Sequence, residues 1–176
     1  MKIPNEMPES SGLTVRRISP EDNRLAISNI YEQSWKTAYS GIVPQDYLDA
    51  IPQGRWASKI DTPGWRTLVC ELDGKLIGTS SVSRSRFEEY PEEGEIISIY
   101  LLPEYMHKGY GRKLLAAAVD ELSEYEDIFL WVLEDNTNAR RFYESQGFVL
   151  TEGCLENEIG GKVLREVRYK LSRERS

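Results

Sequence analysis

Hydrophobic and polar positions alternate along the early part of the chain in runs that have the length of β-strands. Three such runs are Leu13 to Ile18, Thr67 to Leu72 and Lys75 to Val82. Asp73-Gly74 separates the last two and accepts positive φ at little cost, so it indicates a tight hairpin. Ile96 to Leu102 is apolar and rich in β-branched residues, which predicts an interior strand that Pro103 ends.

Helical patterns occupy the segments between these strands. We expect a helix from Ser19 to about Tyr39, with Ser19 as its N-cap and Pro20 in its first turn. Shorter helical patterns run through Tyr47 and Leu48 and from Trp56 to Ile60. A further helix is predicted from about Gly111 to Tyr125.

The second half of the chain predicts a crossover unit. The strand at Ile96 to Leu102, the following helix and a buried strand at Ile128 to Leu133 imply two parallel strands. Asn136 opens a short helix that Gly147 closes, and Phe148 starts the next strand. Gly160-Gly161 then turns the chain into a last strand, Val163 to Leu171. The predicted fold class is α/β: a mixed, mostly antiparallel twisted sheet with one parallel crossover and helices on both faces.

Length and composition indicate one domain. The chain has 176 residues, 40% of them hydrophobic, which suffices for one hydrophobic core. We expect a flexible N-terminus at residues 1–12, a single domain at residues 13–171 and a flexible C-terminus at residues 172–176.

Charge changes the range of expected partners. Lys and Arg total 22 against 29 Asp and Glu, a net charge of −7, so the surface repels nucleic-acid backbones and no nucleic-acid partner is expected. An acidic surface tolerates cationic, amine-bearing ligands better. The amino-terminal segment lacks an apolar core, and no apolar stretch is long enough to span a bilayer, so no membrane partner and a cytoplasmic location are expected.

Cysteine and histidine usage excludes several kinds of site. Cys70 and Cys154 lack the spacing of a disulfide framework or a metal site, and we expect two free thiols. His107 is the only histidine, which excludes a metal site with two histidine ligands, and no metal is expected. We interpret His107 as a bystander in its loop.

A glycine-bearing loop joins the strand that ends before Pro103 to the next helix. In the segment from Lys108 to Arg112, Gly109 and Gly111 let the backbone approach a bulky ligand. The free N–H groups at the start of the helix converge on the same place. Phosphate is the expected guest at such a helix N-terminus.

Two segments together resemble the GNAT N-acetyltransferase superfamily. Residues 102–115, LPEYMHKGYGRKLL, are similar to its acetyl-CoA loop, and residues 134–148, EDNTNARRFYESQGF, are similar to its asparagine-to-tyrosine helix. They occur in the family's order, separated by a predicted helix and strand. Met106 departs from the family pattern, which has Gln or Arg there, so we expect a supporting contact to be weaker and the site to stay intact.

The resemblance implies acetyl-CoA as co-substrate, without a metal, and an amine as acceptor. In the family the strand, the glycine loop and the asparagine-to-tyrosine helix bind the cofactor, and the Leu101 amide is the expected donor to the thioester carbonyl. Lys108 and Arg112 would add charge near the 3′-phosphate. The matching cofactor-binding positions are Ile99, Tyr100, Leu101, Met106, His107, Lys108, Gly109, Tyr110, Gly111, Arg112, Asn136, Ala139 and Tyr143.

The resemblance also implies the catalytic groups. Tyr143 matches the family tyrosine that protonates the departing CoA thiolate. An amine arrives protonated, so a base or water relay is needed, and Glu95 matches a glutamate base of some members. Its expected neighbours on the same face, Ile97 and Ile99, are apolar and would raise its pKa. Glu92, Glu93 or an ordered water are alternative bases. The non-catalytic interpretation is that Glu95 is only the polar residue at the start of its strand.

The acceptor is less visible in the sequence. In the family, helices after the first strand form one wall of the acceptor site, and here Tyr31 and Tyr39 are the candidate substrate-binding residues, with Trp35 interpreted as packing. The acidic loop from Glu88 to Glu95 suits a polyamine, an aminoglycoside or a peptide N-terminus, and the sequence does not choose. Family members often form homodimers through sheet edges, and we expect one here.

The sequence bears on three functional hypotheses. The leading hypothesis is an N-acetyltransferase that uses direct transfer in a ternary complex. The alternative is a catalytically silent acyl-CoA-binding sensor or interaction module, which needs the amide loop but neither Tyr143 nor Glu95. A nucleotide-binding Rossmann domain is disfavoured because only one parallel strand follows the glycine loop.

Overall fold

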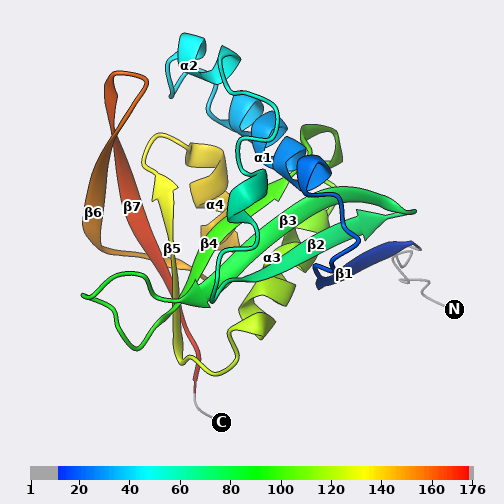
Figure 1. The fold of residues 1–176 in the computed structure, drawn as a ribbon. Helices are drawn as coiled ribbons and strands as arrows, with labels where there is room; N and C mark the ends of the chain where they lie inside the picture. The colour runs from blue at the N-terminus through cyan, green and yellow to red at the C-terminus, as the bar shows by residue number, and fades with distance from the viewer. Residues whose placement is uncertain (1–11, 175–176) are drawn as a thin grey trace, which may run out of the picture.

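One sheet of seven strands, in the order β1-β2-β3-β4-β5-β7-β6, organises residues 12–174, the part of the chain that the computed structural model describes (Figure 1). The strands are β1 Leu13–Arg17, β2 Arg66–Leu72, β3 Lys75–Arg84, β4 Gly94–Leu101, β5 Asp127–Leu133, β6 Val149–Ile159 and β7 Lys162–Ser172. The helices are α1 Arg24–Ala38, α2 Gln45–Asp49, α3 Tyr110–Glu121 and α4 Thr137–Ser145, with short 3-10 helices η1 Ala57–Lys59 and η2 Pro103–Tyr105.

The predicted fold class is confirmed. Every pair of neighbouring strands is antiparallel except β4 and β5, which α3 connects and which run parallel. Both hairpins occur where the sequence places them. Asp73 and Gly74 have φ of 49° and 82°, and Gly160 and Gly161 have φ of 62° and 83°, the left-handed region that such short turns require.

Helices cover both faces of the sheet (Figure 1). On one face Leu114 and Leu115 of α3 pack in a cluster with Ile96 and Val132. On the other face Leu48 of α2 packs in a second cluster with Leu133. Val132 and Leu133 are consecutive, and successive side chains of a strand point to opposite faces, so β5 supplies both layers.

The start of α1 differs from the prediction. The N-cap is Asn23, whose side-chain oxygen accepts the N–H groups of Leu25 and Ala26. Ser19 precedes the helix, and Asp22 accepts its backbone N–H at 2.8 Å. The Asp22 carboxylate in turn binds Arg16, so residues 19–22 form a turn tied to β1 and the helix begins only after it. Pro20 therefore lies outside the first turn of the helix.

Other boundaries need smaller corrections. The helix expected to reach Tyr125 ends at Glu121, because Leu122 leaves the helical conformation at φ −101° and ψ 28°. The expected flexible ends lie largely outside the described residues, at 1–11 and 175–176. Within them, Gly12 accepts the N–H of Asp73, and Ser172 is the last residue of β7. Cys70 and Cys154 are free thiols, as predicted.

Candidate active site

A gap opens in the middle of the sheet between β4 and β5. Within residues 12–174 these strands pair only at Gly94 with Ile128 and at Glu95 with Phe129. Just beyond, the register of β4 against β3 shifts: Ile96 faces Val82, Ser98 faces Ser81, and Ile97 is the extra residue of a β-bulge. Because a bulge bends its strand and increases the local twist, β4 diverges from β5 after Glu95.

The glycine loop lies at the far end of this gap. Gly109 is the N-cap of α3 with φ of 84°, and His107 also has a left-handed φ of 61°. Within the described chain, no backbone carbonyl accepts the N–H groups of Tyr110, Gly111 and Arg112, and a Cβ at Gly109 would meet no atom within 4 Å. Free amides around an open space form an anion-binding concavity, so the loop fits the diphosphate of coenzyme A.

Gly111 lies where α3 packs against its neighbours. A Cβ at this position would lie 3.4 Å from Leu101 Cδ1 and 3.6 Å from Phe142 Cζ, so the first turn of α3 packs against both β4 and α4. Lys108 and Arg112 are exposed beside it, as is Met106 at 38%. All loop positions predicted from the family pattern therefore lie at one end of α3.

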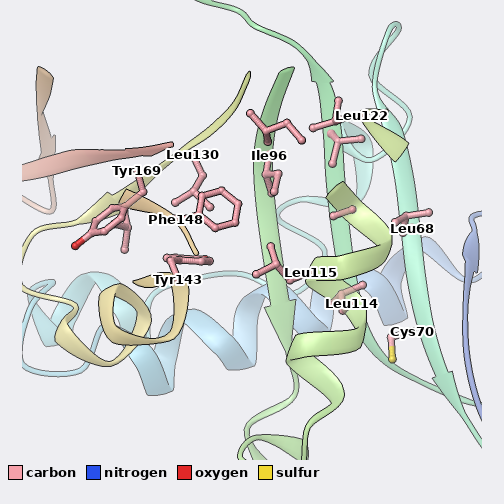
Figure 2. Packing of buried hydrophobic residues seen from close by; sticks show 14 of the residues in the cluster. Leu68, Cys70, Ile96, Leu114, Leu115, Leu122, Leu130, Tyr143, Phe148 and Tyr169 are labelled. Atoms are coloured by element: carbon pink, nitrogen blue, oxygen red, sulfur yellow. The ribbon is translucent and has the colours of Figure 1, made fainter. Parts of the chain in front are cut away.

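The second predicted segment forms α4. Asn136 is its N-cap, and the side-chain oxygen accepts the Ala139 N–H at 3.3 Å, which confirms the predicted capping role. Gly147 follows the helix with φ of 92°, as its predicted closing role requires. The helix holds Tyr143 in place: its ring packs against Phe148 at a centroid distance of 6.0 Å and is 8% exposed (Figure 2).

Three tyrosines, Tyr143, Tyr100 and Tyr39, influence one another electrostatically. Tyr143 belongs to α4, Tyr100 to β4, and Tyr39 is the residue at which α1 ends. Burial and then the neighbouring Tyr100 raise the pKa of Tyr143, and burial foremost raises the pKa of Tyr100 to about 12. Burial also raises the pKa of Tyr39 well above its usual value, with Tyr100 and Tyr143 among the further causes. All three therefore hold their protons at neutral pH.

Beside this group is an aromatic cavity of about 180 Å³ between α1, η1 and β4. Tyr31, a candidate substrate-binding residue, lines it, with its hydroxyl 2.9 Å from Ser98 Oγ. Tyr39 does not line it. Trp35 donates its Nε1–H to the Tyr100 hydroxyl at 3.1 Å and packs against the cluster that contains Leu48 and Leu133, which confirms its predicted packing role. The full lining is Tyr31, Trp56, Lys59, Trp65, Ile97, Ser98 and Tyr100.

Sequence reasoning missed Trp56 and Trp65 as cavity residues. The available signal was their position: they flank Pro63-Gly64 just before β2, in a segment that the fold lays over β4. Both tryptophans contribute aromatic side chains to the lining of the cavity, and Lys59 contributes a cationic one.

The expected apolar surroundings of Glu95 are wrong on two counts. The bulge at Ile97 moves Ile99 to the opposite face, where it packs against the core cluster that contains Leu114. Arg86 pairs with the carboxylate, donating from Nη2 at 2.6 Å, from Nε at 3.1 Å and from its backbone N–H at 3.1 Å. Glu95 is 1% exposed, so this charge is buried and neutralised by a bidentate partner.

This ion pair predicts an asymmetric effect on stability. Arg86→Met leaves the buried Glu95 without its partner and is expected to lower the free energy of unfolding by about 3 kcal/mol. Glu95→Gln should cost less, because the Arg86 side chain is 47% exposed and its charge can turn to water. Urea unfolding of both variants measures the difference.

The exposed pair of Arg17 and Glu121 supplies the control. Arg17→Met is expected to cost less than about 1 kcal/mol, as for other exposed pairs. If Glu95→Gln proved more costly than Arg86→Met, the buried carboxylate would not be the group that needs compensation.

The alternative bases named from the sequence differ in setting. Glu93 pairs with Arg168, which is itself buried against Tyr90 and Phe129, and with Lys170 at 3.8 Å. Glu92 is exposed in the loop before β4. Both lie in the segment that connects β3 to β4, and neither lines the aromatic cavity.

Residues 12–174 contain no group of three or more His, Cys, Asp or Glu side chains able to hold a metal ion. None of their helices is long and apolar enough to cross a membrane.

Comparison with known proteins decides the family. The acetyltransferase (GNAT) family matches residues 26–148, which include the glycine loop and α4. The chain belongs to the GNAT family. The resemblance inferred from its two segments is thus confirmed.

Individual GNAT relatives align over most of the chain. YuaI of Bacillus subtilis (strain 168), an N-acetyltransferase by name, is 32% identical over 161 residues, 88% of this chain and 90% of YuaI. A spermidine N(1)-acetyltransferase of Thermoplasma acidophilum is 24% identical over 165 residues, 90% of this chain and 98% of that protein. The structure of yncA from Salmonella typhimurium, solved with its cofactor acetyl-CoA, has a TM-score of 0.72 at 22% identity and covers 94% of this chain and 96% of its own, a likeness of fold.

Proposed function

We propose that this GNAT protein transfers an acetyl group from acetyl-CoA to a primary amine, directly, within a ternary complex. The observation that carries the proposal is the alignment of three features along one gap in the sheet: the amide-lined loop at α3, the unpaired edge of β4 and the buried hydroxyl of Tyr143. Family membership and a relative named for spermidine acetylation support an amine as acceptor.

The residues present fit acetyl-CoA. The amides of residues 107–112 would hold its diphosphate, with Lys108 and Arg112 adding positive charge. The edge of β4 at residues 99–101, together with Asn136 and Ala139, would hold the pantetheine arm. The cofactor supplies an activated acetyl thioester, and the chain supplies orientation and proton transfer.

Tyr143 is the proposed general acid. Within the described residues its hydroxyl makes no hydrogen bond, and its raised pKa keeps the proton available for the departing thiolate. Glu95 stays a sequence-based prediction as base, but its carboxylate is engaged by Arg86, and we infer that its main role is to hold the loop after β3. The aromatic cavity is the proposed acceptor site, with Tyr31 in its wall.

The alternative is a silent acyl-CoA-binding module. It requires the loop at α3 but gives no reason for an unbonded tyrosine hydroxyl in the gap. An enzyme requires that hydroxyl to be free for a reacting group, and this favours catalysis.

Release of the CoA thiol over a panel of amines tests the proposal. The panel contains polyamines, free amino acids, peptides with free N-termini and aminoglycosides. We expect at least one class to drive thiol release above the rate without amine. Tight acetyl-CoA binding without transfer to any amine would favour the silent module, and no binding of acetyl-CoA would overturn both interpretations.

A further inference from the structure

The side chain of Glu166 on β7 faces the same side of the sheet as α1 and α2. Its neighbours two positions away on the strand show this: Leu164 packs with Val43 and Leu48, and Arg168 lies over Phe129. Side chains two positions apart on a strand share a face. Glu166 also pairs in register with Leu133, at the end of β5 beyond the point where β4 and β5 separate.

One carboxylate oxygen of Glu166 accepts a hydrogen bond, and tyrosines are among the groups that interact with this carboxylate. Asn157 of β6 donates to Oε2 at 2.7 Å. The titratable and charged groups that interact electrostatically with it are Tyr39 at the end of α1, Tyr100 of β4 and Arg86 of the loop after β3, and Arg168 follows it on the same face of β7. Tyr100 in turn adjoins Tyr143. Glu166 is half-buried and makes no ion pair within residues 12–174.

Glu95 and Glu166 are therefore unlike as proton acceptors. Three hydrogen bonds from Arg86 occupy both oxygens of Glu95, which is 1% exposed. The one hydrogen bond of Glu166 leaves its second oxygen available on the face that carries the tyrosine hydroxyls. A base needs a carboxylate oxygen that can take up a proton, and of these two residues only Glu166 offers one without losing an existing partner.

We propose that Glu166, rather than Glu95, accepts the proton from the ammonium group of the acceptor. This rests on the proposed acetyl transfer. One N–H bond of the ammonium breaks and its proton moves to the Glu166 carboxylate. The neutral amine then forms the C–N bond, the C–S bond breaks with its electron pair left on sulfur, and Tyr143 protonates the sulfur. The nitrogen then loses a second proton, which returns to the Tyr143 phenolate, and the proton on Glu166 passes to solvent.

The proposal gives a signed pH dependence. Burial raises the pKa of Glu166, opposed by the hydrogen bond from Asn157 and by the charge of Arg86. The carboxylate form is the base, so kcat falls as the pH is lowered through the raised pKa. The acid limb of the kcat profile is thus expected above the ordinary range of a glutamate.

The test is Glu166→Gln, assayed for kcat, KM and the pH profile with the best amine of the panel. The amide retains the size of the side chain and can still bind Asn157. We expect kcat to fall about tenfold, less than the usual loss for a missing base because water can relay the proton, with KM within about twofold and the acid limb lost. Glu166→Asp should recover part of kcat together with the limb.

Two further variants sharpen the result. Glu156→Gln changes an exposed glutamate of β6 and is expected to match the wild type. Glu95→Gln is expected to retain the acid limb even where kcat changes. An unchanged limb in Glu166→Gln, or a rise in KM alone, overturns the role of Glu166 while wild-type transfer upholds the proposed function. Absence of transfer by the wild type would overturn both.

Discussion

Tyr143→Phe is expected to lower kcat by about a hundredfold while the dissociation constant of acetyl-CoA stays within about twofold. The substitution removes one hydroxyl and retains the ring that packs against Phe142 and Phe148. A thiolate is a poorer leaving group than a thiol, so loss of the donor raises the barrier of the step in which sulfur departs. The ground state loses little, because that hydroxyl makes no hydrogen bond within the described residues. Thiol release measures kcat, and calorimetry measures the affinity.

Tyr169→Phe is the matched control. Tyr169 is also buried, but its hydroxyl bonds Glu144 at 2.6 Å and Arg140 at 3.0 Å, contacts that tie β7 to α4. Its loss should lower stability and leave kcat near the wild-type value. Equal losses of kcat in the two variants would show that the effect comes from packing, and wild-type turnover in Tyr143→Phe would remove that residue from the mechanism.

The features predicted best are those that depend on local chemistry. Asp73-Gly74 forms its hairpin because both residues tolerate positive φ, whatever surrounds them. Gly109 and Asn136 mark helix starts for equally local reasons, a left-handed N-cap and a side-chain acceptor. The glycine loop at the start of α3 could thus be located from a few consecutive residues.

The features that were missed depend on pairing between distant segments. A bulge is defined only relative to a partner strand, so the sequence from Glu95 to Leu101 does not by itself indicate that Ile97 is the extra residue. The face assigned to Ile99 was wrong for that reason. The Arg86 partner of Glu95 was missed because the loop after β3 folds back onto β4.

Glu166 illustrates a second limit. The sequence predicts an alternating strand there, and alternation correctly groups Leu164 with Arg168. Which face of the sheet that group occupies depends on β7 lying between β5 and β6, an insertion that the order along the chain does not reveal. The predicted start of α1 was wrong for a different reason. Ser19-Pro20 is a valid local signal for a helix start, but the ion pair of Arg16 with Asp22 holds these residues in a turn, and the helix begins after Asn23.

Gly109→Val is expected to weaken acetyl-CoA binding by about a hundredfold. Gly109 has φ of 84°, and the space in front of its Cα is open to at least 4 Å. A valine side chain would occupy that space, where the diphosphate is proposed to meet the free amides of Tyr110 and Gly111. Loss of two charge-assisted hydrogen bonds, at about 1.5 kcal/mol each, corresponds to about two decades in affinity.

Backbone strain alone would also harm the protein, so a control must reproduce it. Gly161 at the β6–β7 turn has φ of 83° and equally open surroundings, which makes Gly161→Val a match in conformation and in space. Both variants should lose about 1–3 kcal/mol of unfolding free energy, because a β-branched residue is strained in the left-handed region. Only Gly109→Val should lose affinity by calorimetry. Equal affinities in the two variants would mean that the start of α3 does not bind the cofactor, since the strain is shared and only the position differs.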